Sequence, residues 1–249
     1  MKSRREIQES MTFGLFIALC TLLVLPSCNK NRSVETPRAE RNAQIETEEP
    51  APTNANEALA RLLKGNDRFV AGNALHRHQD VTRRKELIGE QHPFATILGC
   101  SDSRVPAELL FDQGLGDLFV VREAGNVVTT VDLGSIEYAV DHLHTPLVLV
   151  LGHESCGAVT AALEPQAVRN KEAKDIQKLL ALILPALKGI DPKLSVSERV
   201  SRGVDSNVRW SIQQLENSPE LKEKIANGHL TVMGAVYDLE TGKVRLLKS

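Results

Sequence analysis

Three side chains of the kind that binds transition metals follow two apolar segments of strand length. Cys100 comes directly after the apolar run 93–99, and His153 and Cys156 come after the run 146–152. Two thiolates and one imidazole suit zinc, and a site with three protein ligands leaves the fourth coordination position open for reaction. Two other interpretations stand beside zinc: a disulfide between Cys100 and Cys156, or two buried thiols without a metal.

An acidic and a basic residue follow the first of these cysteines. Asp102 and Arg104 lie two positions apart, so in an extended segment their side chains can point the same way. An arginine fork holds a carboxylate in a fixed orientation. Held in this way, Asp102 would either orient a zinc-bound water or bind the zinc itself and close the site. A surface ion pair is the alternative interpretation.

The segments around these residues predict an α/β fold, with a mostly parallel central β-sheet flanked by helices. Continuous apolar runs are expected for strands that are covered on both faces. Helical spacing between such runs predicts βαβ units. Ligands bind outside the carboxyl ends of parallel strands, so Cys100 and His153 are expected to meet at that edge. The predicted strands are residues 93–99, 116–122 and 146–152.

Apolar residues at helical spacing predict several helices, and the C-terminal segment predicts a β-hairpin. The first helix opens the folded domain near residue 58, with Asn56 as its N-cap. Gly234, in the first arm of the hairpin, predicts a bulge or a close packing contact. The other predicted helices are 131–143, 158–163, 173–188 and 196–216, and the hairpin arms are 230–237 and 244–247.

The composition is that of an ordinary globular protein without strong charge. Of the 249 residues, 42% are hydrophobic and 25% are charged, and the net charge is -2. We expect no nucleic-acid partner, because the chain has no basic field that would attract one. Four cysteines are too few for a fold of this length that depends on disulfide bonds, and the chain is long enough to bury a hydrophobic core without them.

The N-terminal segment predicts export. Residues 1–27 are typical of a signal peptide, because basic residues precede an apolar run, 13–25, that is shorter than the roughly 20 residues needed to span a membrane. The segment 25–28 resembles a bacterial lipobox, although Pro26 is unusual in it, so Cys28 is expected to be lipidated. Residues 28–56 are polar and predict a flexible tether, and residues 57–249 form the folded domain.

The lipobox resemblance also implies a location. Asn29 rather than Asp follows the cysteine, which implies a periplasmic protein that a lipid holds to the outer membrane. Contact with the membrane is then expected through the lipid anchor only. A plain signal peptide and an uncleaved anchor are the alternatives.

Two motifs, in this order, resemble those of the β-class carbonic anhydrases. They are CSDSRVP at residues 100–106 and GHESCGA at residues 152–158. The resemblance implies the fold of that family, a homodimer or tetramer, and one Zn²⁺ per chain held by Cys100, His153 and Cys156. It implies that Asp102 and Arg104 act beside the zinc. Further similar segments lie at 66–72, 91–94, 111–122, 124–126, 134–139 and 234–238.

The resemblance further implies that the protein is an enzyme of the lyase class, a carbonic anhydrase. Zinc-bound hydroxide attacks carbon dioxide to form bicarbonate and a proton, and the reaction is reversible. Gln113 resembles an amide that helps to hold the substrate in a partner subunit's site, and Asp102 would be a fourth zinc ligand in an inactive form. Two alternatives stand: a zinc hydrolase of carbonyl sulfide or carbon disulfide on the same scaffold, and a non-catalytic zinc-binding lipoprotein.

Overall fold

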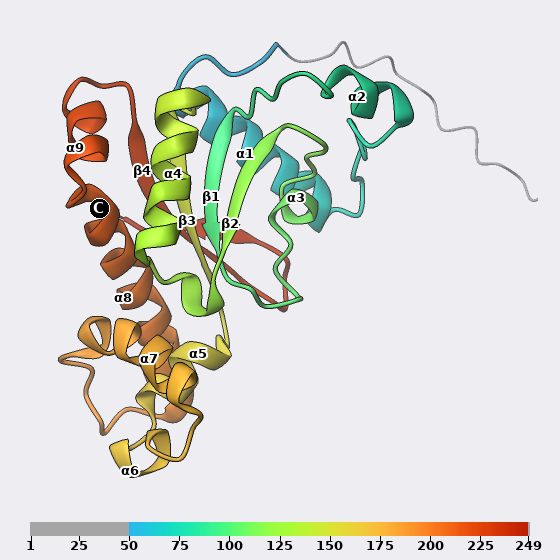
Figure 1. Cartoon of the computed structure of the whole chain (residues 1–249). Helices are drawn as coiled ribbons and strands as arrows, with labels where there is room; N and C mark the ends of the chain where they lie inside the picture. Colours follow the sequence, from blue (N-terminus) through green and yellow to red (C-terminus); the bar gives the residue numbers. More distant parts are fainter. Residues whose placement is uncertain (1–49, 249) are drawn as a thin grey trace, which may run out of the picture. The chain divides into compact units, whose positions relative to one another are not determined.

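The computed structural model describes residues 50–248, whose arrangement is shown in Figure 1. The predicted signal peptide and residues 28–49, which include Cys28 and most of the predicted tether, lie outside the described residues, so these stay predictions. Within residues 50–248, no helix is both long enough and apolar enough to cross a membrane.

A five-stranded sheet forms the centre of the described part, with the strand order β2-β1-β3-β4-β5. The pairs β1–β2, β1–β3 and β3–β4 are parallel, and the pair β4–β5 is antiparallel. The predicted mostly parallel sheet with a C-terminal hairpin is therefore confirmed. The strands are β1 (Ala95–Gly99), β2 (Leu118–Arg122), β3 (Leu147–His153), β4 (Thr231–Tyr237) and β5 (Val244–Leu246).

The two strands that lead to the predicted metal ligands are buried along their whole length, as predicted. Every residue of β1 and of β3 is buried. β2 differs, because each of its residues is half-buried although its apolar run predicted cover on both faces. The reason is its place at the edge of the sheet, where it pairs with β1 alone among the described strands.

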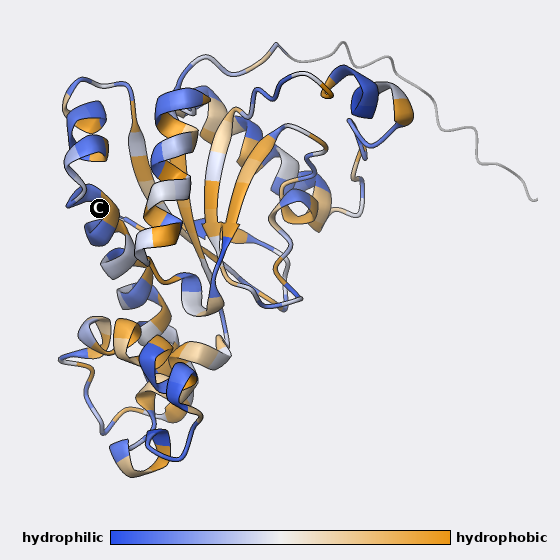
Figure 2. Ribbon diagram, in the orientation of Figure 1, coloured by the Kyte–Doolittle hydropathy of each residue, from blue (hydrophilic) through white to orange (hydrophobic). Residues whose placement is uncertain are grey.

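Alternate residues of the strands face two hydrophobic layers on opposite sides of the sheet. Ile97 and Leu149 face one layer, and Leu98 and Val150 face the other. Figure 2 shows apolar strands between helices that are hydrophilic over much of their length. The first layer contains α1 (Ala55–Val70) and α3 (Ala107–Leu110), and the second contains α4 (Thr130–His142), α5 (Gly157–Leu163), α7 (Lys174–Ile183), α8 (Val196–Glu216) and α9 (Pro219–Ala226).

The predicted helices are present, with two corrections. The side-chain oxygen of Asn54 accepts the N–H of Glu57 at 3.0 Å, so Asn54 is the N-cap of α1 and the prediction of Asn56 is wrong. The predicted helix 173–188 is divided into α7 and the 3₁₀ turn η2 (Leu184–Leu187), because Pro185 has no N–H to continue a helix. Four short helices were not predicted: α2 (Val81–Glu86), α3, α6 (Gln166–Arg169) and α9.

Helix α8 lies close against β3 and β4, and two glycines permit this approach. A Cβ at Gly152 would lie 2.5 Å from the Cγ2 of Val208, and a Cβ at Gly234 would lie 2.7 Å from the Cγ1 of the same valine. The predicted packing contact at Gly234 is therefore confirmed. Because Gly152 directly precedes His153, α8 is seated next to the carboxyl end of β3.

Candidate metal centre

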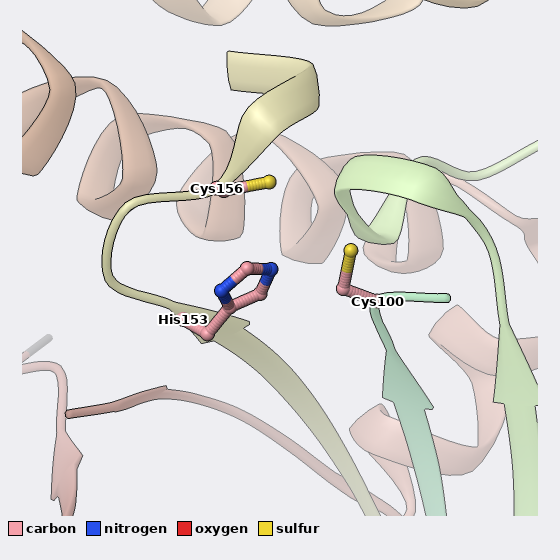
Figure 3. A group of neighbouring side chains, drawn as sticks. All are labelled: Cys100, His153 and Cys156. Atoms are coloured by element: carbon pink, nitrogen blue, oxygen red, sulfur yellow. The ribbon is translucent and has the colours of Figure 1, made fainter. Parts of the chain in front are cut away.

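The three predicted metal-binding side chains come together at the carboxyl edge of the sheet. Cys100 follows β1, His153 ends β3, and Cys156 is the N-cap of α5. Because Gly99 of β1 is level with Leu151 of the neighbouring parallel strand, the two strand ends lie side by side. The potential ligand atoms all lie within 4.8 Å of one another and all three residues are buried, and Figure 3 shows them facing a common space.

A backbone hydrogen bond orients the ring of His153. Its Nδ1 lies 2.9 Å from the carbonyl oxygen of Glu154, and a carbonyl can only accept, so Nδ1 carries the hydrogen. The lone pair is then on Nε2, which is buried and has no hydrogen-bond partner among the described residues. A buried nitrogen without a partner is costly unless something else binds it. A zinc ion between Nε2 and the two sulfurs would bind it, so the residues present fit the metal.

Both cysteines are free thiols, so the alternative of a disulfide between Cys100 and Cys156 is not what the structure contains. The N–H of Gly125 donates to the Sγ of Cys100 at 3.3 Å. A hydrogen bond from Cys156 lowers the pKa of the Cys100 thiol, and the same contact, together with burial, raises the pKa of Cys156. Metal ligands must be deprotonated, so a cation between the sulfurs is needed to hold both as thiolates.

Asp102 and Arg104 form the predicted ion pair beside this group. The Nε of Arg104 donates to Oδ1 of Asp102 at 2.9 Å, and its Nη2 donates to Oδ2 at 2.7 Å. Oδ2 also lies 3.8 Å from Nε2 of His153, so the carboxylate reaches the potential ligands. The hydrogen bonds from Arg104 hold the pKa of Asp102 well below its usual range, which keeps this carboxyl ionised at neutral pH.

The pair meets through a turn and not through an extended segment as predicted. The N–H of Arg104 donates to Oδ1 of Asp102 at 2.9 Å, and the N–H of Val105 donates to the backbone carbonyl of Asp102 at 3.0 Å. Aspartate commonly begins such turns, because its side chain can accept a hydrogen bond from the backbone two positions later. The two side chains therefore meet because the chain reverses direction between them.

Arg122 is a residue of the site that the sequence analysis missed. It ends β2, and the strand register places it level with Gly99. Its Nε donates to the carbonyl of Cys100 at 3.0 Å and its Nη2 to the carbonyl of Asp102 at 2.6 Å, so one guanidinium holds the loop after β1 at two points. The available signal was a charged residue at the carboxyl end of an apolar strand, where parallel sheets place binding residues.

Gln113 is not joined to the potential ligands by the contacts described. Its side chain is buried, and its Nε2 donates to the carbonyl of Phe111 at 2.7 Å. Within residues 50–248, the hydrogen bonds of this amide stay in the segment after α3. Its predicted role in the site of a partner subunit stays a prediction.

The fold and the site together are typical of a zinc enzyme built on an α/β sheet. A mostly parallel α/β sheet carries two thiols, one imidazole and an arginine-bound carboxylate at its carboxyl edge. Two sulfurs and one nitrogen from the protein are typical of catalytic zinc sites, in which the fourth position stays open. Within residues 50–248, these three side chains are the one group of three or more that could hold a metal ion in this way.

Comparisons with known proteins identify the family. The family model described as carbonic anhydrase matches residues 95–244. The chain is 44% identical over 196 residues to carbonic anhydrase 2 of Mycobacterium tuberculosis, an alignment that covers 78% of this chain and 93% of the relative. It is 42% identical over 195 residues to a carbonic anhydrase of Mycolicibacterium smegmatis, with 78% and 94% covered.

Solved structures place the fold within one class of that family. A tetrameric β-carbonic anhydrase of Sordaria macrospora is similar with a TM-score of 0.62 and 29% identity, covering 77% of this chain and 97% of the other. The β-carbonic anhydrase of Coccomyxa is similar with a TM-score of 0.62 and 32% identity, covering 76% and 86%. The chain belongs to the carbonic anhydrase family, in its β class.

Proposed function

We propose that this protein catalyses the reversible hydration of carbon dioxide to bicarbonate and a proton, with a zinc ion held by Cys100, His153 and Cys156. Carbonic anhydrase activity follows from the family. The assignment of the ligands rests on one observation, that the Nε2 of His153 has no hydrogen-bond partner among the described residues. This nitrogen is buried and lies within 4.8 Å of two free thiols.

The chain's own residues orient the reacting water in this proposal. When bound, zinc supplies a Lewis acid that makes water a nucleophile near neutral pH. Oδ2 of Asp102 faces the same space as Nε2 of His153, 3.8 Å away, so it can accept one hydrogen of that water. Arg104 binds both carboxylate oxygens and stops the carboxylate from rotating. With its remaining hydrogen directed at Asp102, the deprotonated water would keep a lone pair that faces the substrate carbon.

Asp102 does not carry the product proton away in this scheme. A base that takes up and releases a proton works best with a pKa near the working pH. Arg104 holds the pKa of Asp102 far lower, so the carboxyl stays ionised and keeps one role, that of acceptor. The same two hydrogen bonds favour this role over the predicted alternative, in which Asp102 is a fourth zinc ligand in an inactive form.

We also propose that the protein acts as a homodimer or tetramer, and that Gln113 serves the site of a partner subunit. The relative from Sordaria macrospora is described as tetrameric. The half-buried edge strand β2 suits a second copy, because an uncovered apolar edge is otherwise a liability in water. Light scattering of the purified protein measures the assembly, and a monomer at assay concentration would refute it.

Export and a lipid anchor at Cys28 are part of the same proposal. Their support is the sequence of the N-terminal segment, in which an apolar run leads to the lipobox-like residues 25–28. The proposal places the enzyme in the periplasm, attached to the outer membrane through lipid alone.

Carbon dioxide hydration measured by stopped flow, with zinc content determined on the same sample, tests the function. We expect one zinc per chain and activity, and we expect Cys156→Ser to lose both. Zinc with release of hydrogen sulfide from carbonyl sulfide or carbon disulfide, and no hydration, would identify the alternative hydrolase. Zinc without any turnover would identify a binding protein, and a protein without zinc would refute the metal centre.

A further inference from the structure

The turn that follows β2 has an unusual backbone and touches the metal centre. The 3₁₀ turn η1 (Ala124–Asn126) contains two successive residues with positive φ, 70° at Gly125 and 45° at Asn126. This left-handed region is unfavourable for residues other than glycine, so the surrounding structure must hold it. In this conformation the N–H of Gly125 donates to the Sγ of Cys100 at 3.3 Å.

Helix α8 holds this turn with two side chains that lie one helical turn apart. The Nδ2 of Asn207 donates to the carbonyl of Gly125 at 2.6 Å. The Oγ of Ser211 donates to the carbonyl of Asn126 at 2.8 Å, and the side chain of Asn126 lies 3.3 Å from the same hydroxyl. Both α8 side chains are buried. The helix itself is fixed by the close contact of Val208 with Gly152.

Stability explains only one end of the Asn207 amide, the Nδ2 that pairs the buried carbonyl of Gly125. The Oδ1 of the same amide is buried without a hydrogen-bond partner among the described residues. Such an oxygen is costly, and an apolar side chain of similar size would avoid that cost. What an apolar side chain would not provide is the donor to Gly125. The carbonyl that accepts this bond and the N–H that meets Cys100 belong to the same residue, so fixing one restricts the direction of the other.

We propose that Asn207 is a positioning residue of the metal centre, which aims the N–H of Gly125 at the sulfur of Cys100. This inference rests on the proposed metal site. A hydrogen bond to a metal-binding sulfur withdraws electron density from it, and partners of this kind orient the ligand and adjust the metal. Asn207 thus acts on the metal through Gly125 and Cys100, without contact to the substrate.

Cobalt(II) in place of zinc gives a test that does not depend on activity. The full chain is freed of metal and reconstituted with cobalt, and the thiolate-to-cobalt charge-transfer absorption is recorded in the near ultraviolet. Asn207→Leu should move this absorption to longer wavelength, because a sulfur without its N–H donor gives up electrons more easily. Competition with a chelator should show metal affinity lowered about tenfold, the lower end of the range for residues that support ligands.

Two further variants distinguish a change in the position of the turn from a loss of folding stability. Leu215→Ala, also buried on α8, removes packing without touching the turn, so it should lower the unfolding temperature and leave the absorption unchanged. Ser211→Ala removes the two hydrogen bonds that Ser211 makes to Asn126 and should shift the absorption in the same direction, by less than Asn207→Leu. If Asn207→Leu does not fold, Ser211→Ala is the variant that tests whether α8 positions the turn.

The outcomes are distinguishable. An absorption at the wild-type wavelength in folded Asn207→Leu, or in Ser211→Ala when the first variant fails to fold, overturns the inference and leaves the metal centre intact. The same shift in Leu215→Ala also overturns it, because loosened packing would then be sufficient. A wild-type chain that shows no thiolate-to-cobalt absorption refutes the metal centre itself.

Discussion

Arg104 binds Asp102 with two atoms of its guanidinium, Nε to Oδ1 at 2.9 Å and Nη2 to Oδ2 at 2.7 Å. The backbone N–H of the same arginine also donates to Oδ1, at 2.9 Å. Three hydrogen bonds from one residue therefore fix a carboxylate that lies 3.8 Å from Nε2 of His153. An acceptor fixed in this way is organised before substrate arrives, which is the condition for efficient electrostatic catalysis.

Replacing this acceptor tests its role. Asp102→Asn should keep one zinc per chain and lower kcat/KM for hydration at least about 100-fold, because an amide is a weaker acceptor and can turn its NH₂ toward the water. Stopped-flow kinetics and metal analysis on one sample measure both. Asp205→Asn, which removes a carboxylate paired with Arg245 outside the site, is the control and should keep its activity. Turnover like that of the wild type in Asp102→Asn would remove Asp102 from the mechanism.

The guanidinium of Arg122, which clamps the loop after β1 at two carbonyls, leads to a second prediction. Lysine in Arg122→Lys keeps the charge but cannot reproduce the two bonds to the carbonyls of Cys100 and Asp102. We expect kcat/KM to fall about tenfold, and the free energy of unfolding to fall by about 1–3 kcal/mol, the usual range when a buried hydrogen-bond partner is left unsatisfied. Denaturant unfolding and stopped-flow kinetics measure these. Arg245→Lys is the control, and equal effects in both variants would contradict a clamp specific to the site.

Activity should depend on pH in one direction. Hydration should rise between about pH 6.5 and 9, because the nucleophile forms by loss of a proton from water at the metal. Asp102 does not produce this rise. A carboxyl whose pKa is lowered on folding contributes stability above its unfolded pKa of about 3.9 and loses that contribution only as the pH falls toward the folded value. A flat pH–rate profile over this window would contradict the proposed nucleophile.

Two glycines with nearly equal φ angles allow the cost of backbone strain to be distinguished from the cost of steric crowding. Gly125 has φ 70° and Gly228 has φ 73°. A Cβ at Gly125 would lie 2.8 Å from Cδ1 of Ile183 and 3.1 Å from Cβ of Ala158, an atom that side-chain rotation cannot move, whereas a Cβ at Gly228 would meet nothing within 4 Å. Gly228→Ala should therefore cost about 1–2 kcal/mol from the backbone alone. Gly125→Ala should cost about 1–3 kcal/mol more and lower zinc content. Calorimetry and metal analysis decide, and equal losses of stability in the two variants would contradict crowding at Gly125.

The anchor can be tested in cells. Wild-type protein expressed in a Gram-negative bacterium with a labelled fatty acid should carry the label and sediment with outer membranes. Cys28→Ser should abolish both, because the thiol is the acceptor of the lipid. Cys20→Ser, within the predicted signal peptide, is the matched control and should leave both unchanged. A labelled Cys28→Ser protein would exclude Cys28 as the lipidated residue.

The candidate site could be predicted from the sequence where its signals are local. Continuous apolar runs predicted β1 and β3, because strands of a parallel sheet are buried on both faces. Since parallel strands end at a common edge, the positions of Cys100 and His153 after those runs predicted that they meet, and the structure confirms this. The short spacing from His153 to Cys156 completed the group.

Tertiary structure alone decided how that group is supported. Arg122 reaches the Cys100 loop because β2 pairs with β1 in one register, and Asn207 reaches Gly125 across 82 positions of sequence. The exposure of β2 likewise depends on the order of the strands in the sheet. The types and spacing of the three predicted ligands indicated zinc chemistry, because both can be read directly along the chain. The hydrogen bonds that orient those residues join segments far apart in sequence, and only packing brings such segments together.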